Sequence, residues 1–332
     1  MATTPPLRSS VPPGLIWAYR FREGGEPEAL RDEEVPAALE SLEGWLWLHF
    51  SLTDNRAREW IAHFERLPVK ARTLFQQNDE RLRIETDCDA IFGVFSDFNL
   101  EFDGGGEDYG RLRFAFSDHI VISARRHALR SVEETRQALA RGKPMPAAAN
   151  LIEAIVENFC DGAVNLITKL NDDLDHVEDH VVADRVEDER RHLVPIRRAA
   201  VGLHRQLTSL LGVFRPLVNK LPPGELKFQT DALALRLDGL ARDLAALQDR
   251  ARLLQDEISA KLAEATNRSL NLISMMTALM LPGTLITGLF GMNAGPVPFA
   301  TTAGGFWWVL GICMMVTVIF ILLLRRIGVR IS

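Results

Sequence analysis

The chain has 332 residues, of which 47% are hydrophobic and 25% are charged, and these averages are typical of a soluble protein of about two domains. The charges are nevertheless unevenly distributed, because no Asp, Glu, Lys or Arg occurs between Ser269 and Leu324. All 44 acidic residues precede this segment, and the chain after it carries only arginines as charged residues. This pattern excludes a purely soluble protein, a strongly basic nucleic-acid binder and a transporter that encloses its solute within many helices of one chain. We therefore expect a lipid bilayer, and no nucleic acid, among its partners.

Residues 1–146 are expected to form a cytoplasmic α/β domain. Short apolar or alternating runs predict strands, and helical spacing between them predicts two helices. The run Gly104-Gly105-Gly106 predicts a hairpin loop, because no phosphate-loop Lys accompanies it. Residues 1–14 lack the apolar core of a signal peptide, so residues 1–268 are expected to stay in the cytoplasm. The predicted strands cover residues 15–21, 45–50, 81–85, 90–100, 111–116 and 119–123, and the predicted helices cover residues 55–66 and 69–77.

Residues 147–268 are expected to form a helical stalk region. Leu, Ile and Val recur at steps of three and four residues up to the sequence LPPG at residues 221–224, which predicts a break. From Glu225 onward, leucines at heptad-like spacing continue into the charge-free segment without a capping signal. We therefore predict one helix from about Glu225 to about Phe290, on the order of 100 Å long at about 1.5 Å per residue.

The charge-free segment predicts two membrane spans, residues 269–290 and residues 306–324. Each is long enough to cross a bilayer core of roughly 30 Å, which needs about 20 helical residues. Residues 291–305 between them are rich in Gly and Pro and predict an outer turn. Because basic residues flank both spans on the same side, including the tail at residues 325–332, both termini are expected to be cytoplasmic.

Two spans cannot easily enclose a hydrophilic path, so transport of a polar solute would need several copies around an axis. One face of the long helix is suited to line that axis, because it is mildly polar within the membrane and acidic at its cytoplasmic end. The alternative is that its Ser and Thr hydroxyls only bond to carbonyls of their own helix. At steps of three and four residues, this face contains Thr284, Leu281, Thr277, Ile273 or Ser274, Leu270, Asn267, Ala263 and Asp256.

The tripeptide Gly291-Met292-Asn293 directly follows the apolar run LPGTLITGLF and precedes the second apolar span. This arrangement resembles the CorA superfamily of divalent-metal transporters, whose signature is a Gly-Met-Asn between two C-terminal spans. The resemblance implies an α+β membrane protein that forms a funnel-shaped homopentamer in the bacterial inner (plasma) membrane. It also implies that the first span lines the central pore, with pore positions at Gly291, Met292, Asn293, Thr284, Asn267 and Asp256.

The residues after the tripeptide bear on the ion. The uncharged continuation at residues 294–298 resembles the ZntB-like branch, which is associated with zinc, whereas Met292 departs from the Val that this branch commonly carries. The resemblance therefore implies transport of Zn²⁺, together with Cd²⁺, Ni²⁺ or Co²⁺, and a CorA-type Mg²⁺/Co²⁺ channel is the alternative. Zn²⁺ prefers His, Cys or carboxylate ligands, and the predicted pore face offers none before Asp256, so the ion would pass largely hydrated. No resident cofactor is expected.

An acidic segment at residues 171–189 contains a second candidate site. His176 and His180 are four residues apart and share a helix face, with Asp172 and Asp173 nearby, so a cytoplasmic Zn²⁺ site is one interpretation and a solvated helix turn is the other. A membrane-anchored scaffold or sensor also stays open as a function. No Ser-His-Asp, HExxH or Walker pattern occurs, so an enzyme is not expected.

Overall fold

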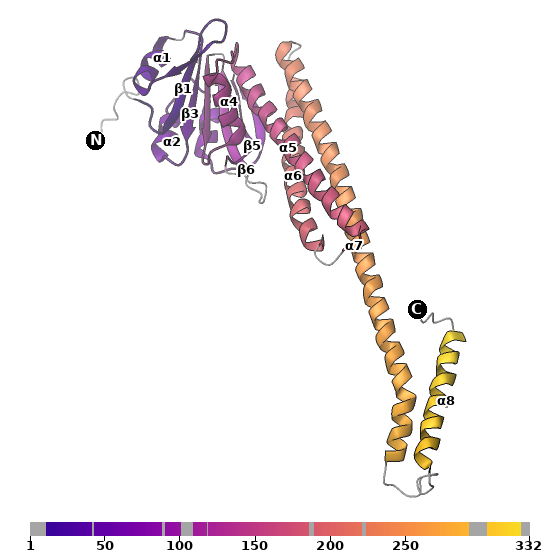
Figure 1. The fold of residues 1–332 in the computed structure, drawn as a ribbon. Helices are drawn as coiled ribbons and strands as arrows, with labels where there is room; N and C mark the ends of the chain where they lie inside the picture. The colour runs from indigo at the N-terminus through magenta and orange to yellow at the C-terminus, as the bar shows by residue number, and fades with distance from the viewer. Residues whose placement is uncertain are drawn as a thin grey trace. The chain divides into compact units, whose positions relative to one another are not determined.

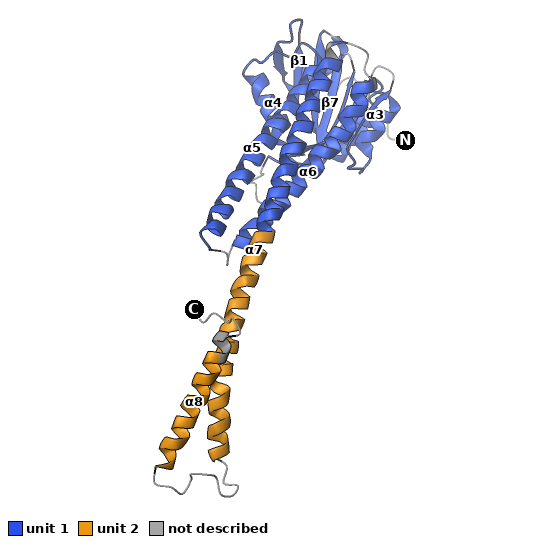
Figure 2. Cartoon of the chain, turned by 90° about the vertical axis from the view of Figure 1, so that its right-hand side faces the viewer, with its two compact units in different colours: residues 1–255 blue, residues 256–332 orange. Residues whose placement is uncertain are grey.

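The computed structural model describes residues 11–41, 43–87, 90–100, 109–117, 119–185, 189–220, 224–291 and 304–326. The chain divides into two compact units, residues 1–255 and residues 256–332 (Figure 2). The predicted glycine turn at residues 104–106 lies outside the described residues, as do Met292 and Asn293.

Within its described part, the first unit contains a seven-stranded sheet of order β2-β1-β3-β7-β6-β5-β4 (Figure 1). Neighbouring strands are antiparallel except β3 and β7, which run parallel with Leu46 opposite Ile120. A parallel pair needs a long crossover connection, and the chain between β3 and β7 contains α2, α3 and three of the other strands. The strands are β1 (Leu15–Phe21), β2 (Pro27–Leu30), β3 (Trp45–Ser51), β4 (Arg83–Asp87), β5 (Ala90–Phe98), β6 (Tyr109–Ser117) and β7 (Ile120–Arg125); the short helices are η1 (Asp32–Glu34), α1 (Val35–Ser41), α2 (Asn55–Ala62), α3 (Val69–Gln76) and α4 (Arg130–Ala140).

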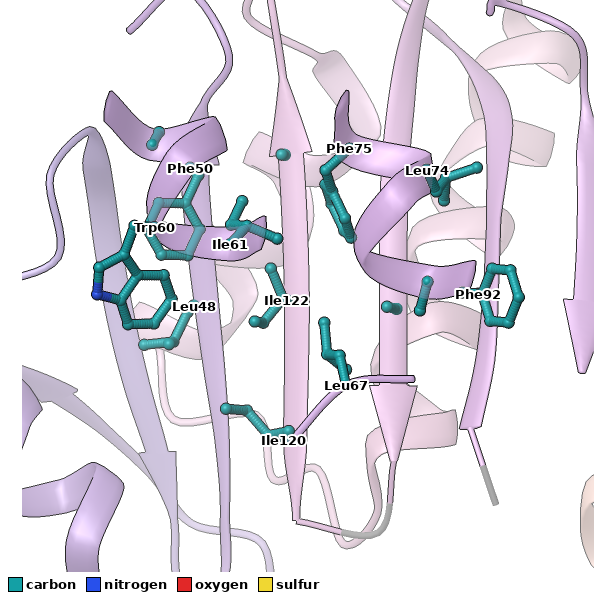
Figure 3. Close-up of a cluster of buried hydrophobic side chains, with 14 of the residues drawn as sticks. Leu48, Phe50, Trp60, Ile61, Leu67, Leu74, Phe75, Phe92, Ile120 and Ile122 are labelled. Atoms are coloured by element: carbon teal, nitrogen blue, oxygen red, sulfur yellow. The ribbon is translucent and has the colours of Figure 1, made fainter. Parts of the chain in front are cut away.

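One face of the sheet is covered by α2 and α3. Alternate side chains along the strands, such as Phe50 of β3 and Ile122 of β7, meet Ile61 of α2 and Phe75 of α3 in one buried apolar cluster (Figure 3). The period of two along a strand sends these side chains to the same face. Burial of each such side chain contributes roughly 1.5–3 kcal/mol, so this cluster is the main force that holds the two helices on the sheet.

The opposite face carries a buried carboxylate beneath α4. Asp97 of β5 accepts hydrogen bonds from the backbone N–H of Ser131 (3.0 Å) and from its hydroxyl (2.5 Å), at the beginning of α4. A carboxylate at this place satisfies N–H groups that lack a partner within the helix and interacts favourably with the helix dipole. Burial raises the pKa of Asp97 to about 7, although the donors around it favour the charged form.

Three long helices follow the sheet. Within the first unit they pack through aliphatic side chains, and Leu174, Leu207 and Leu244 are fully buried, one from each helix. Arg250 also forms an ion pair with Asp175 across two of them, with 2.6 Å between Nη1 and Oδ1. The helices are α5 (Ala148–Val182), α6 (Glu189–Lys220) and α7 (Glu225–Gly291).

The second unit contains the end of α7 and the helix α8 (Gly305–Arg326), which runs back beside it in both views (Figures 1 and 2). Half-buried positions recur on both helices at steps of three and four residues, so the two helices pack side by side as a hairpin. Pro282 does not interrupt α7, as membrane helices tolerate Pro. The half-buried positions include Met275, Ala278, Pro282 and Ile286 on α7, and Val309, Ile312, Val316 and Phe320 on α8.

The six predicted strands and the continuous helix α7 are confirmed, with ends that differ by a few residues. The elements β2, α1 and α4 were not predicted from the sequence. The two compact units divide after Gln255, and the predicted domain boundaries at residues 146 and 268 stay a prediction. Helix α5 packs directly on the sheet, where Phe159 stacks on Phe98 with ring centroids 5.0 Å apart.

Candidate pore helix

In the second unit, α7 presents an exposed face that coincides with the predicted pore stripe. Asp256, Asn267, Thr277, Leu281 and Thr284 are all exposed. At about 100° per residue, these five positions fall within roughly 100° of arc. The half-buried positions that face α8 are centred roughly 115–140° away around the helix, and Ala278 lies beside the edge of the stripe at Asn267. The described part of α8 therefore leaves the predicted stripe uncovered.

The threonine hydroxyls on this face bond to their own helix. Thr277 Oγ1 donates to the carbonyl oxygen of Ile273, and Thr284 Oγ1 donates to that of Met280, both at 2.9 Å. Both hydroxyl hydrogens are therefore used in bonds to carbonyls of the same helix, as the alternative interpretation of this stripe predicts. Each hydroxyl oxygen keeps lone pairs that can accept a hydrogen bond from water. Thr277 and Thr284 can therefore present acceptor oxygens to a hydrated solute without any loss of helical bonds.

The ends of the stripe differ in chemistry. Asp256 supplies an exposed carboxylate at the N-terminal end of the stripe, where the second unit begins. Gly291 is the last residue of α7 and is exposed. Met292 and Asn293 lie outside the described residues, so their placement in a pore stays a prediction.

The remaining surface of the two helices is apolar and exposed. Leu272, Met276 and Met280 on α7, and Trp307 and Met315 on α8, each expose more than half of their surface. Both Lys227–Gly291 and Gly305–Leu322 contain a window long and apolar enough to cross a membrane, with mean hydropathy of 1.7 and 2.3. A helix that is apolar on nearly all sides and unburied is suited to lipid rather than to water.

The predicted cytoplasmic metal site is only partly brought together. His176 and His180 approach each other, with ring centroids 4.4 Å apart, and His176, Asp172 and Asp173 are all exposed. Across the described parts of the chain, no three His, Cys, Asp or Glu side chains gather in a group that could hold a metal ion. Zinc sites use three or four protein ligands, so two histidines alone make an incomplete site. The pair stays a prediction, which zinc calorimetry of wild-type and His176→Ala/His180→Ala protein would test.

His180 contacts Glu189, a partner that was not predicted from the sequence. Its Nδ1 lies 2.6 Å from Oε1 of Glu189, and Nδ1 of His192 lies 3.3 Å from Oε2 of the same carboxylate. Burial acts to raise the pKa of Glu189, but its hydrogen bonds with the two histidines prevail and lower it. The spacing of Glu189 and His192, three residues apart at the beginning of α6, was an available signal for the His192 contact alone.

Comparison with known proteins places this geometry in a family. The family model described as CorA-like Mg2+ transporter protein matches residues 43–326. The divalent cation transporter CmaX of Pseudomonas aeruginosa is 28% identical over 89% of this chain and 90% of that protein. The zinc transport protein ZntB of Yersinia pseudotuberculosis is 25% identical over 92% of this chain and 91% of that protein.

Solved structures agree with this match. The structure of full-length CmaX has a TM-score of 0.80 at 27% identity and covers 94% of this chain and 97% of that chain. The CorA magnesium transporter from Methanocaldococcus jannaschii has a TM-score of 0.74 at 17% identity, with coverage of 93% and 97%, which is a likeness of fold.

The matched range contains most of the sheet, the long helices and both apolar helices. It thus includes every candidate pore residue from Asp256 to Asn293. The chain belongs to the CorA family of divalent cation transporters, whose members are not enzymes.

Proposed function

We propose that this chain carries Zn²⁺ across the bacterial inner membrane as a homopentamer whose central pore is lined by α7. Both termini lie in the cytoplasm, and α8 lies outside the ring of α7 helices. The observation that carries the proposal is the exposed face of α7 from Asp256 to Thr284, which the described part of α8 leaves uncovered. A symmetric ring of α7 helices would cover that face and convert it into the wall of a pore.

The donor chemistry of this face favours a hydrated ion. Thr277 and Thr284 offer hydroxyl oxygens, and Asn293 adds an amide oxygen at the outer end of the span. Such neutral oxygens can accept hydrogen bonds from the waters of a divalent cation without displacing them. At the cytoplasmic end, five copies of Asp256 would raise the local concentration of cations. Cd²⁺, Ni²⁺ and Co²⁺ should therefore be carried as well as Zn²⁺.

Two sets of observations bear on the ion. Zinc is supported by the name of the ZntB relatives and by the uncharged residues 294–298 after the Gly-Met-Asn tripeptide. Magnesium is supported by the description of the matching family and by Met292. The alternative function is accordingly a Mg²⁺/Co²⁺ channel with the same pore.

Reconstituted liposomes test the proposal directly. Purified protein is inserted into vesicles that contain a trapped zinc dye or a trapped magnesium dye, and each metal is then added outside under the same gradient. We expect a zinc signal well above that of protein-free vesicles and above the magnesium signal. A larger magnesium signal would support the alternative channel. No signal from either dye would leave the two apolar helices as an anchor for a scaffold or sensor.

A further inference from the structure

The first unit contains a second pocket that the transport proposal does not use. It has a volume of about 420 Å³ and lies where β5 ends, β6 begins and β7 ends. Three arginines, Arg111, Arg113 and Arg126, line it, and Glu80 is the acidic residue among its described lining. Together they form the arginine pocket.

The sheet register explains why the three arginines meet. Arg111 and Arg113 are two residues apart on β6 and therefore point to the same face. Arg113 lies opposite Ala124 of β7, so Arg126, two residues further along, falls on that face opposite Arg111. Arg113 Nη2 donates to the carbonyl oxygens of Gln77 (3.3 Å) and Asp79 (3.1 Å), just after α3.

The positive charge in this pocket is poorly compensated. Arg111 donates to Ser96 Oγ (2.9 Å) and Arg126 donates to Asn78 Oδ1 (2.5 Å), so these bonds, like those of Arg113, go to neutral groups. Within the described ranges, none of the three arginines forms an ion pair.

Of the three arginines, Arg113 is the most deeply buried. Its side chain is 1% exposed, and its Nε has no hydrogen-bond partner among the residues described. Burial lowers the pKa of Arg113, the neighbouring guanidinium of Arg126 lowers it further, and Glu80 opposes both. Glu80 and Asp79 lie close enough to act to raise the pKa of Arg113 but form no ion pair with it among the described residues. A buried charge without such a partner is costly, so the pocket favours an anion.

We propose that the arginine pocket binds a phosphate group, either free or as part of a small phosphate ester. Guanidinium groups present a planar fork of N–H donors that matches phosphate oxygens two at a time, and three such groups converge here. The volume exceeds what one phosphate needs and lies within the range of small-molecule sites, about 300–1,000 Å³. A phosphate here would supply the ion-pair partner that Arg113 and Arg126 lack among the described residues.

Calorimetry on full-length protein in detergent tests the site with inorganic phosphate, ATP and adenosine in chloride buffer free of divalent metal. We expect about one phosphate-bearing ligand per chain, and no heat from adenosine. Arg126→Gln should weaken binding at least about tenfold, in line with about 1.5–3 kcal/mol for a hydrogen bond to a charged group. Arg113→Lys keeps the buried charge but removes the fork, and should weaken binding similarly. The matched control is Arg141→Gln, which removes an exposed arginine outside the pocket and should leave binding unchanged.

Comparing the two ligands distinguishes free phosphate from a phosphate ester as the natural occupant of the pocket. Heat from inorganic phosphate assigns free phosphate, and heat from ATP alone assigns a phosphate ester. Absence of binding by both would overturn the proposal. Equal affinities for wild type, Arg126→Gln and Arg113→Lys would overturn it too, because binding would then occur elsewhere.

Discussion

Substitution of Asn293 tests most directly whether this residue lines a pore or only forms part of the turn after α7. It follows α7 by two residues, and its amide offers one acceptor oxygen and two donors. Five copies around an axis could face the first-shell waters of a cation. Asn293→Ala removes that ring and leaves the length and hydrophobicity of α7 intact, so we expect near-loss of divalent uptake into dye-loaded liposomes with unchanged assembly.

Asn293→Asp is the informative companion variant. It keeps the side-chain shape and adds up to five negative charges to the proposed ring. Capture of a divalent cation should tighten and its release should slow, so the order of preference between Zn²⁺ and Mg²⁺ should change. Wild-type uptake by a well-assembled Ala variant would make Asn293 a turn residue and move ion selection to Thr284 or Asp256.

Thr284 allows a matched comparison within the membrane. Thr284 and Thr317 each donate their hydroxyl to the carbonyl four residues earlier, Met280 and Cys313, at 2.9 and 2.8 Å. Thr284 lies on the exposed face of α7, whereas Thr317 is half-buried on α8. Thr284→Val should reduce Zn²⁺ uptake roughly threefold to tenfold, as expected for about 0.5–1.5 kcal/mol per lost hydrogen bond. Thr317→Val should leave uptake near wild type, and equal loss in both variants would mean that the exposed face does not line the path.

At the scale of elements, buried Asp97, which bonds the beginning of α4 to the sheet, should make the free energy of unfolding depend on pH. Burial raises the pKa of Asp97 to about 7, above its ordinary value of 3.8. Between these values the native chain holds a proton that the unfolded chain has lost, so the free energy of unfolding should fall as pH rises from about 4 to 7. Thermal unfolding of the full-length protein in detergent at several pH values measures this slope.

Asp97→Asn should remove much of that slope, because an amide does not titrate. The control is Asp231→Asn, which changes an exposed carboxylate on α7 and should keep the wild-type slope. An Asp97→Asn variant whose melting temperature shifts with pH as the wild type does would show that other groups control the dependence.

The elements that the sequence predicted are those with strong apolar periodicity. WLWLHF reads as a strand and is β3, the centre of the buried cluster, and the leucine-rich run after Glu225 reads as one helix and is α7. By contrast, β2 is a short edge strand with the sequence PEAL, and its charge and proline carry little strand signal. In α4, buried Ser131 and Thr135 occupy core positions, so the apolar stripe that would indicate a helix is incomplete.

The candidate sites, like the elements, could be predicted only where a regular period along the sequence reports them. The exposed stripe on α7 could be predicted, because residues at three- and four-residue steps of a single helix share a face by geometry alone. The contact of Glu189 with His180 joins two helices across residues 186–188, and no helical period reports such a contact. The arginine pocket depends on the register of β6 with β7 and on the end of α3, which the sequence does not specify.

At the scale of the whole molecule, α7 also carries an apolar stripe outside the predicted spans. Phe228, Leu235 and Leu253 are 77%, 65% and 70% exposed, although α7 buries other leucines against α5 and α6. They are separated by 7 and 18 residues, or about two and five helical turns, and therefore share one face. Exposed apolar side chains in register on a soluble segment are typical of a surface that contacts another copy.

The proposed pore forms only if several copies of the chain associate. A substitution at Leu253 tests this association. Light scattering of the wild type in detergent should give a protein mass of roughly 186 kDa, five times the 37.2 kDa chain. Leu253→Glu places five charges on the shared face of the α7 helices, so the pentamer fraction should fall and Zn²⁺ uptake should fall with it. Val201→Glu, at an exposed position of α6, introduces the same charge elsewhere and should keep the pentamer mass. A monomeric wild type would exclude a pore between copies, because two spans of one chain cannot surround a hydrated cation.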